Sequence, residues 1–365
     1  MPIIIFLIIL LVLVIAHEFG HFFVAKRSGI RVDEFAFGFP PKLFSVKKGE
    51  TTYAFNALPI GGYVKIYGED PTQVIEGDTE RSFTHKPRWV QSMVILAGIA
   101  ANILVAWILF TLILSIGMRS SVGGNTFGTL SNVEVLVTQV LEGSPAAQAG
   151  MKGGDVLLGL RDKTTGLSMS VKTLEDVTTF VAAREGKPIV MTLSRKGVQE
   201  DLTVIPKLGI TDSGRPAVGI AMDEAGLLKL PIHLAVLEGA LKTYDYTVST
   251  AVGIFDFLYQ AVTGHANFKE VSGPVGIVGA VGDAAKLGFV NVLFFAALIS
   301  INLAVINLIP FPALDGGRFF FIIIESIIRR PLPAKVTAWV NSIGFAALML
   351  LMIIVTYHDI IKLFH

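Results

Sequence analysis

Residues 3–27 read IIIFLIILLVLVIAHEFGHFFVAKR, and this stretch decides the class of the fold. The run from Ile3 to Ala16 is wholly apolar, and the stretch exceeds the ~20 residues that a helix needs to cross a bilayer. Its positive charges, Lys26 and Arg27, follow the apolar run, whereas a signal peptide carries its charges in front of that run. We therefore predict a membrane-spanning helix that is not cleaved.

Three further apolar runs predict membrane spans over Trp89 to Met118, Phe289 to Leu314 and roughly Val336 to Tyr357. The composition agrees, because 52% of the residues are hydrophobic and only 16% are charged, against about 25% charged residues in soluble domains. The net charge of +1 gives no reason to expect nucleic-acid binding. The absence of cysteine excludes disulfides and thiolate ligands, so any zinc site must use histidine and carboxylate.

Lysine and arginine concentrate in two of the segments that join these runs. Because loops rich in these residues stay in the cytoplasm, we expect both segments there, and both chain ends and residues 119–288 on the other side. The basic residues are Lys26, Arg27, Arg31, Lys42, Lys47, Lys48, Lys65, Arg81, Lys86 and Arg88 in the first segment, and Arg329, Arg330 and Lys335 in the second.

The segment 231–264 is rich in apolar residues, but it also carries charged residues that would be costly in lipid. Its apolar residues recur at helical spacing, and Glu238 and Lys242 form an i,i+4 pair. We predict an amphipathic helix packed on the membrane surface or on the helix bundle; an ordinary soluble helix is the alternative. The apolar positions are Leu234, Leu237, Leu241, Tyr244, Val248, Val252, Phe255 and Tyr259.

Residues 121–230 have the composition of a small soluble domain. Ser144, followed by proline, predicts the start of one helix, and Thr173 with Asp176 resembles the capping box of another. The stretch SPAAQAGMKGGDVLLGL (144–160) looks like part of a PDZ domain, a domain that binds extended peptides by adding a strand to a sheet edge. A spacer domain without a ligand is the alternative. Strands are predicted over 133–140, 155–160, 189–194 and 202–205.

The sequence HEFGH at residues 17–21 has the form HExxH. His17 and His21 lie on one face of a helix, so both imidazoles can reach one metal ion. Glu18 is adjacent and can take a proton from an attacking water. Three ionisable side chains inside a hydrophobic span are expensive and usually functional. The alternative is a polar cluster that packs two helices together.

Zinc needs a third protein ligand and an open position, and Asp315 is the candidate. It ends the third apolar run, within NLIPFPALDGG (307–317). His17 lies ~22 Å into the first span at 1.5 Å per residue, toward its cytoplasmic side, and the third span reaches Asp315 at its own cytoplasmic end. The two residues therefore match in depth, although an Asp-Gly pair taken alone predicts only a turn.

Asn307 lies one to two turns deeper than Asp315 in the same motif. Pro310 and Pro312 interrupt helical hydrogen bonding between them, and broken backbone at this depth is tolerated where it lines a polar cavity. The Asn307 amide could bind a substrate carbonyl or the developing oxyanion. A helix-packing role for this side chain is the alternative.

The loop after the first span has strand character over Val32 to Phe37 and Tyr53 to Tyr67. An exposed edge near Gly62, Tyr63 and Val64 could pair with an unwound substrate segment. This fits peptide hydrolysis, because a helical peptide hides the carbonyls that water must attack. A purely structural hairpin is the alternative.

Together these motifs resemble the site-2 protease family of intramembrane zinc metalloproteases. The likeness rests on HEFGH, GGYVK (61–65), SGPVGI (272–277) and NLIPFPALDGG. The arrangement with one inserted PDZ-like domain is most similar to the bacterial regulator-of-sigma-E proteases. Two features depart from the family: there is room for only one PDZ domain, and Gly98 to Asn102 (GIAAN) lacks the proline of a common Gly-Pro-x-Ala-Asn element. The small residues of this element still permit close helix packing.

The resemblance implies that His17, His21 and Asp315 bind Zn²⁺, that Glu18 is catalytic and that Asn307 is the motif asparagine. It implies hydrolysis of peptide bonds in or near transmembrane segments. Expected substrates are single-pass membrane proteins such as anti-sigma factors, or signal-peptide remnants. In the family, the segment after the first span forms a β-loop that dips toward the membrane.

We therefore predict a polytopic α-helical membrane protein with four transmembrane helices, a membrane-associated β-loop and one inserted α/β PDZ-like domain. We expect it in the bacterial inner membrane, with both termini and the PDZ-like domain outside the cytoplasm, in contact with lipid, with a peptide ligand for the PDZ-like domain and without nucleic acid. A non-catalytic PDZ-containing membrane tether and a metal transporter are the alternatives. The predicted parts are 1–27 (first transmembrane helix, with HExxH), 28–88 (β-loop), 89–118 (second transmembrane helix), 121–230 (PDZ-like domain), 231–288 (amphipathic helix and SGPVGI linker), 289–330 (third transmembrane helix, with the LDG motif) and 335–358 (fourth transmembrane helix).

Overall fold

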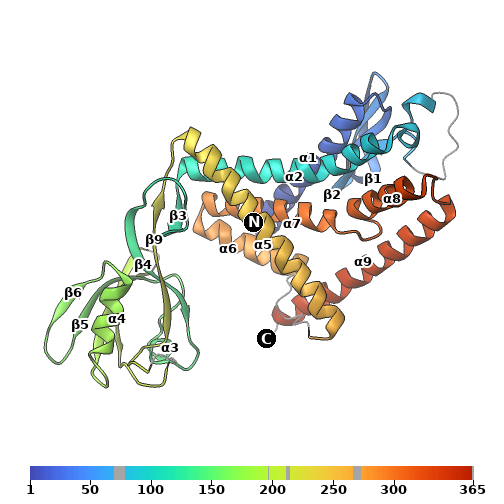
Figure 1. Ribbon diagram of the computed structural model, residues 1–365. Coiled ribbons are helices and arrows are strands. Elements are labelled where there is room, and N and C mark those ends of the chain that lie inside the picture. The colour runs from blue at the N-terminus through green and yellow to red at the C-terminus, as the bar shows by residue number, and fades with distance from the viewer. Residues whose placement is uncertain (70–78, 196, 211–213, 266–272, 364–365) are drawn as a thin grey trace. The chain divides into compact units, whose positions relative to one another are not determined.

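The computed structural model describes residues 1–69, 79–195, 197–210, 214–265 and 273–363. The chain divides into two compact units, one formed by Met1–Ile113 with Gly239–His365 and the other by Leu114–Glu238. The first unit is mainly helical and carries the long apolar helices, whereas the second is built on a β-sheet (Figure 1).

Among the described residues, four helices are long and apolar enough to cross a membrane. The first ends where the apolar run meets Lys26 and Arg27, and Gly29 follows it in the left-handed conformation that often closes a helix. The fourth begins directly after Pro333. These helices are α1 (Pro2–Arg27), α2 (Arg88–Ile116), α7 (Phe289–Leu308) and α9 (Ala334–Leu363).

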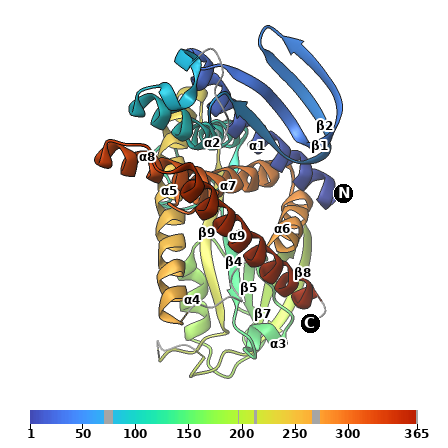
Figure 2. The ribbon, with the colours of Figure 1, turned by 90° about the vertical axis from the view of Figure 1, so that its right-hand side faces the viewer.

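The loop after α1 forms a long antiparallel pair, β1 (Val32–Lys48) and β2 (Thr51–Ile66), both longer than the predicted strands. Residues 34–37 of β1 pair with 52–55 on one side and with 62–65 on the other. Within the described residues no strand pairs with the far side of 62–65, so this segment is a sheet edge. The pair lies beside α1 (Figure 2). Two short 3₁₀ turns, Thr79–Arg81 and Phe83–His85, precede α2.

The segment predicted as the third transmembrane helix, 289–330, forms two helices, with a break where the two prolines were expected to interrupt helical hydrogen bonding. The first, α7, ends at Leu308, and α8 (Asp315–Ile328) begins at the aspartate of the LDG motif. The break has a local cause, because Pro310 and Pro312 cannot donate helical hydrogen bonds. Figure 1 shows α7 and α8 as separate ribbons joined by a non-helical segment.

The segment predicted as an SGPVGI linker contains a helix, α6 (Pro274–Leu287); Ser272 lies outside the described residues. Glycine-rich sequence is a poor helix former, but tertiary contacts stabilise this helix. The buried carboxylate of Asp359 on α9 accepts hydrogen bonds from the amides of Gly273 (3.1 Å) and Gly276 (2.8 Å) at the start of α6. A negative charge at a helix N-terminus is favourable, and the linker prediction missed it because Asp359 is remote in sequence.

The predicted amphipathic helix is α5 (Ile232–Thr263). The predicted apolar stripe is mostly exposed, for example at Leu241, Val248 and Phe255. A neighbouring face packs on the bundle instead, where the ring of Tyr246 stacks on Phe110 of α2 at 5.3 Å between centroids. The exposed stripe is suited to contact with lipid.

The second unit is an antiparallel sheet with two short helices, α3 (Pro145–Gln148) and α4 (Leu174–Ala182). The predicted capping box is confirmed, since Thr173 Oγ1 accepts from the amide of Asp176 and the Asp176 carboxylate accepts from the amide of Thr173. Within the described residues the strand order is β3-β9-β4-β5-β7-β8, with β6 paired to β5. The strands are β3 (Met118–Ser121), β4 (Ser131–Val140), β5 (Val156–Asp162), β6 (Ser168–Ser170), β7 (Ile189–Arg195), β8 (Val198–Val204) and β9 (Ile220–Leu228).

Candidate metal centre

Three predicted residues from the two ends of the chain converge in the helical unit. His17 and His21 lie one turn apart on the buried face of α1, and their Nε2 atoms are 3.2 Å apart. Asp315 Oδ2, at the start of α8, lies 3.0 Å from His17 Nε2 and 3.2 Å from His21 Nε2. Among the described residues this is the group of histidine and acidic side chains whose ligand atoms could hold one metal ion.

The spacing of these three atoms fits zinc. Zinc–nitrogen and zinc–oxygen bonds of about 2.0–2.2 Å in a tetrahedral site place neighbouring ligand atoms about 3.3–3.5 Å apart. The three observed separations lie just below that range. Two imidazoles and one carboxylate also form the His₂-acid set found in catalytic zinc sites, which leaves the fourth position open.

The orientation of His21 is set by a contact with α2. Its Nδ1 atom donates to the main-chain carbonyl of Val94 on α2 at 2.8 Å, and both groups are buried. A carbonyl can only accept, so Nδ1 carries the proton and the Nε2 lone pair is left for a metal ion. The same arrangement orients many zinc-binding histidines.

Two residues of α2 that the sequence interpretation treated only as packing positions belong to this site. A Cβ on Gly98 would overlap the imidazole of His21 and lie 2.8 Å from His17 Cε1, so only glycine leaves room for both rings. One turn later, the fully buried Asn102 has its Nδ2 atom 3.3 Å from His17 Nδ1. The i,i+4 spacing within the GIAAN element puts both residues on one helix face, but it does not show what that face contacts.

Glu18 is half-buried, and its carboxylate lies close enough to His17, His21 and Asp315 to interact electrostatically with all three side chains. It also lies beside the β2 edge, because a Cβ added to Gly62 would be 3.6 Å from Glu18 Cγ. The structure therefore brings together the candidate ligands, the candidate base and one of the predicted substrate-binding residues.

Among the described residues, no hydrogen bond joins the other predicted substrate-binding residues to His17, His21 or Asp315. Asn307 is half-buried near the end of α7. The Tyr63 ring stacks on Phe39 at 6.3 Å between centroids, and Val64 packs against an apolar cluster that includes Ile66. Their roles in binding substrate stay predictions.

The helix that begins with Asp315 is anchored by two ion pairs. Arg318 lies 2.5 Å from Glu69, just beyond the end of β2. Arg88, at the start of α2, lies 2.6 Å from Glu325. These contacts hold α8 against both the β-loop and α2, and so help to place Asp315.

The second unit has its own groove, with a volume of about 260 Å³. It lies between α4 and the start of β9, and its floor and walls are mainly apolar. Residues that line it include Val177, Val181, Val218, Ile220 and Met222.

Comparisons with known proteins identify the family of this chain. Residues 5–351 match the model of peptidase family M50. A protein of Clostridium perfringens that carries a zinc-metalloprotease name is 39% identical over 350 residues, which cover 96% of this chain and 95% of that protein. The regulator of sigma-W protease RasP of Bacillus subtilis is 31% identical over 440 residues, which cover 98% of both chains.

Among solved structures, the PDZ domain of an SdrC-like protein from Listeria monocytogenes is similar to part of the chain. It is 18% identical with a TM-score of 0.22, and the match covers 26% of this chain and 93% of that domain. The family match extends over most of the sequence, and the chain therefore belongs to peptidase family M50, the site-2 type of intramembrane zinc metalloproteases.

Proposed function

We propose that His17, His21 and Asp315 hold the zinc ion of this protease and that Glu18 is its general base. The observation that carries the proposal is the convergence of three ligand atoms within 3.2 Å of one another, beside a half-buried glutamate. Zinc held there would supply a Lewis acid that polarises the scissile carbonyl and makes the attacking water more acidic. Glu18 takes the proton from that water and passes it to the leaving amine.

The substrate is proposed to bind as an added strand along Gly62 to Val64. This segment is a sheet edge, and its Gly62 end lies against Glu18. A strand paired there would present its carbonyls in extended form beside the base, whereas a helical transmembrane segment keeps its carbonyls hydrogen-bonded within itself. Asn307 is proposed to bind the developing oxyanion.

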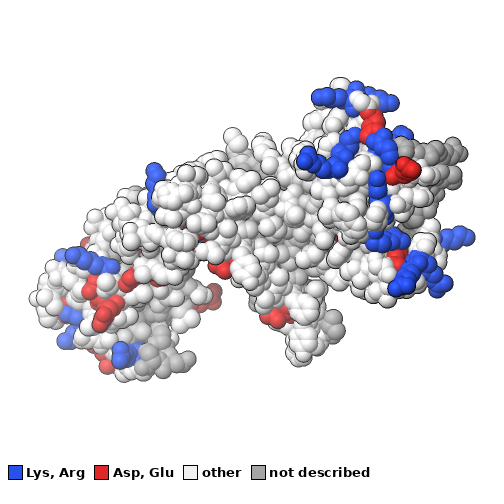
Figure 3. Space-filling model, turned by 45° about the horizontal axis from the view of Figure 1, so that its top comes forward, with Lys and Arg blue, Asp and Glu red and all other residues white. Residues whose placement is uncertain are grey.

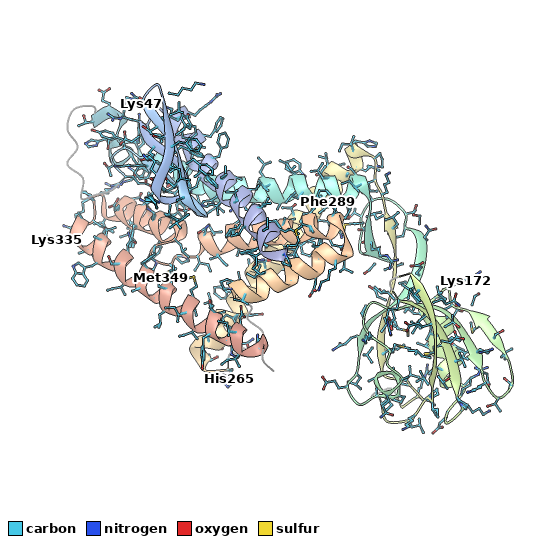
Figure 4. The ribbon with its side chains drawn as sticks, turned by 180° about the vertical axis from the view of Figure 1, so that it is seen from behind. Lys47, Lys172, His265, Phe289, Lys335 and Met349 are labelled. Carbon is cyan, nitrogen blue, oxygen red and sulfur yellow. The ribbon has the colours of Figure 1, made fainter. Side chains whose placement is uncertain are left out.

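We propose that the β-loop end of the helical unit faces the cytoplasm of a bacterium. Figure 3 shows Lys and Arg gathered over this end of the unit. Figure 4 labels Lys47 and Lys335 there, whereas Phe289, the first residue of α7, lies toward the other end. By the positive-inside rule, both chain termini and the second unit then lie outside the cytoplasm.

The second unit is proposed to be a PDZ-like domain that binds an extended peptide. Its strand-flanked groove between α4 and β9 supports this role, because PDZ domains add a ligand strand to a sheet edge. The proposed substrates are single-pass membrane proteins such as anti-sigma factors, or signal-peptide remnants. They would reach the metal centre after other proteases have shortened them.

The test is cleavage of a membrane-anchored reporter by purified wild type and by Glu18→Gln, with zinc content measured in both. We expect cleavage to be lost in Glu18→Gln while zinc stays near one per chain. Glu80→Gln, at an exposed glutamate, is the matched control and should cleave normally. Normal cleavage by Glu18→Gln would overturn the assigned mechanism. Binding of the reporter without cleavage by wild type would favour the membrane tether, and metal flux into vesicles would favour a transporter.

A further inference from the structure

Asn102 is a buried polar residue that the proposed mechanism does not use. It lies on α2 with none of its surface exposed, inside a membrane-spanning helix. Its main-chain carbonyl accepts a hydrogen bond from Ser300 Oγ of α7 at 2.8 Å. Burying an amide without partners is costly, so its side chain is expected to have a specific polar partner.

Within hydrogen-bonding distance of this side chain lies Nδ1 of His17, on the side of the imidazole that points away from the other two proposed zinc ligands. The Nε2 face of His17 points to Asp315 and His21, and its Nδ1 atom lies 3.3 Å from Asn102 Nδ2. A histidine that binds metal through Nε2 carries its proton on Nδ1 and donates it to an acceptor. With the Asn102 nitrogen facing His17, two donors, Asn102 Nδ2 and the protonated His17 Nδ1, would therefore face each other.

The remaining atom of the amide resolves this conflict. Asn102 Oδ1 is buried and has no hydrogen-bond partner among the described residues. A rotation of the amide by about 180° exchanges the oxygen and nitrogen, which have nearly the same shape. The oxygen then lies at the acceptor position beside His17 Nδ1.

We propose that Asn102 is a positioning residue whose Oδ1 accepts the Nδ1 proton of His17, so that the Nε2 lone pair is directed at the zinc ion. The proposal rests on the zinc site proposed above. In this proposal a carbonyl oxygen of α2 orients each of the two imidazoles. The main-chain carbonyl of Val94 orients His21, and the side-chain carbonyl of Asn102 orients His17. Both acceptors lie on the same face of α2, eight residues apart, with Gly98 midway between them.

The experiment measures zinc affinity of metal-free full-length protein in detergent, by competition with a chelator, for wild type, Asn102→Leu and Asn102→Asp. Loss of an outer hydrogen-bond partner weakens metal affinity by about 10–100-fold, and we expect this in Asn102→Leu. Asn102→Asp keeps an acceptor at the same distance and should stay within about threefold of wild type, since a carboxylate also serves as such a partner. Asn302→Leu is the matched control: this asparagine of α7 is exposed, donates to Leu298 within its own helix, and its loss should leave zinc affinity unchanged.

A second readout separates positioning from general packing. The visible spectrum of the cobalt-substituted protein reports ligand geometry, and it should change in Asn102→Leu but not in Asn102→Asp. Equal zinc affinity in wild type and Asn102→Leu would overturn the proposal, as would equal weakening in both Asn102 variants. If wild type itself bound no zinc, the proposed zinc site would fail instead, so the two failures are distinguishable.

Discussion

The imidazole of His21 fills the space into which a Cβ on Gly98 would project. The two residues lie on different helices, α1 and α2, so the proposed zinc site depends on a helix–helix contact as much as on the HExxH motif. A close approach of α1 and α2 is also required at Gly20, where a Cβ would overlap the main-chain carbonyl of Ala97. Small residues at such crossings are the usual means of close packing in membranes.

Gly98→Ala is predicted to displace one or both imidazoles. We expect zinc affinity to fall by about 10–100-fold, as for other losses of ligand orientation, with a fall in reporter cleavage of at least about tenfold. Chelator competition and the cleavage assay check this. Gly253→Ala is the control, because its Cβ would meet no atom within 4 Å; it should leave zinc affinity unchanged. Unchanged zinc binding by Gly98→Ala would show that the helices can separate without cost.

Gly62→Val is predicted to impair substrate binding rather than zinc binding. Its Cβ would lie 3.0 Å from the carbonyl of Ala36 and 3.6 Å from Glu18 Cγ, so the larger side chain would crowd both the sheet edge and the base. We expect kcat/KM for a reporter to fall by about tenfold or more, equivalent to about 1.4 kcal/mol, with zinc content unchanged.

Thr52→Val is the matched control for the edge. Thr52 pairs with Glu34 and so lies on the opposite side of β1 residues 34–37 from Gly62, which pairs with Phe37; the variant should cleave the reporter normally. If Gly62→Val cleaved as fast as wild type, the substrate would have to bind elsewhere.

The ion pair between Arg318 and Glu69 is predicted to couple the β-loop to the helix that carries Asp315. More than a third of the Arg318 side chain is exposed, so the coupling energy should be only about 0.2–1 kcal/mol. Arg318→Met and Glu69→Gln should each slow cleavage by about 1.4- to fivefold, the range that such an energy allows. The double variant should be no slower than the worse single variant. Fully additive effects in this double-mutant cycle would show that the two residues act separately; Arg330→Met, at an exposed position, is the control.

The second unit is predicted to lose stability in acid through Asp162. The amides of Thr165 and Thr164 and the guanidinium of Arg184 donate to its carboxylate and lower its pKa to about 2. Its unfolded pKa is about 3.9, so the folded state gains stability from ionised Asp162 above about pH 4 and loses it as the pH falls toward 2.

Asp162→Asn should therefore lower the unfolding midpoint temperature of this unit at pH 7. The difference in midpoint temperature between the variant and wild type should be smaller at pH 2.5. Scanning calorimetry of the full-length protein checks this, with Glu142→Gln, at an exposed glutamate, as control. If the difference in midpoint temperature did not change with pH, the effect of the substitution would come from altered packing or hydrogen bonding and not from the lost charge of Asp162.

The sequence was sufficient for those parts of the site that follow from local rules. Apolar length predicted the spans, helical periodicity put His17 and His21 on one face, and membrane depth matched them to Asp315. The proline pair predicted the break before α8. Each of these inferences uses neighbours in the sequence or a common reference, the bilayer, that all spans share.

The parts that were missed depend on how helices are rotated against one another. Nothing local to GIAAN says that Gly98 and Asn102 face the histidines rather than lipid, because α2 is apolar on all sides and has no amphipathic signal. Helix α6 was missed for a similar reason, since its start is stabilised by Asp359, a residue more than eighty positions away. Rotation and capping across long separations need tertiary information.

The three candidate ligands come from segments far apart in the sequence, because His17 and His21 lie on α1 and Asp315 follows the break between α7 and α8. The segments between them must be translated and inserted before Asp315 can meet His17 and His21. A nascent chain that has not yet reached α8 thus carries HExxH without the third proposed ligand, and we expect it to be unable to cut its neighbours in the membrane.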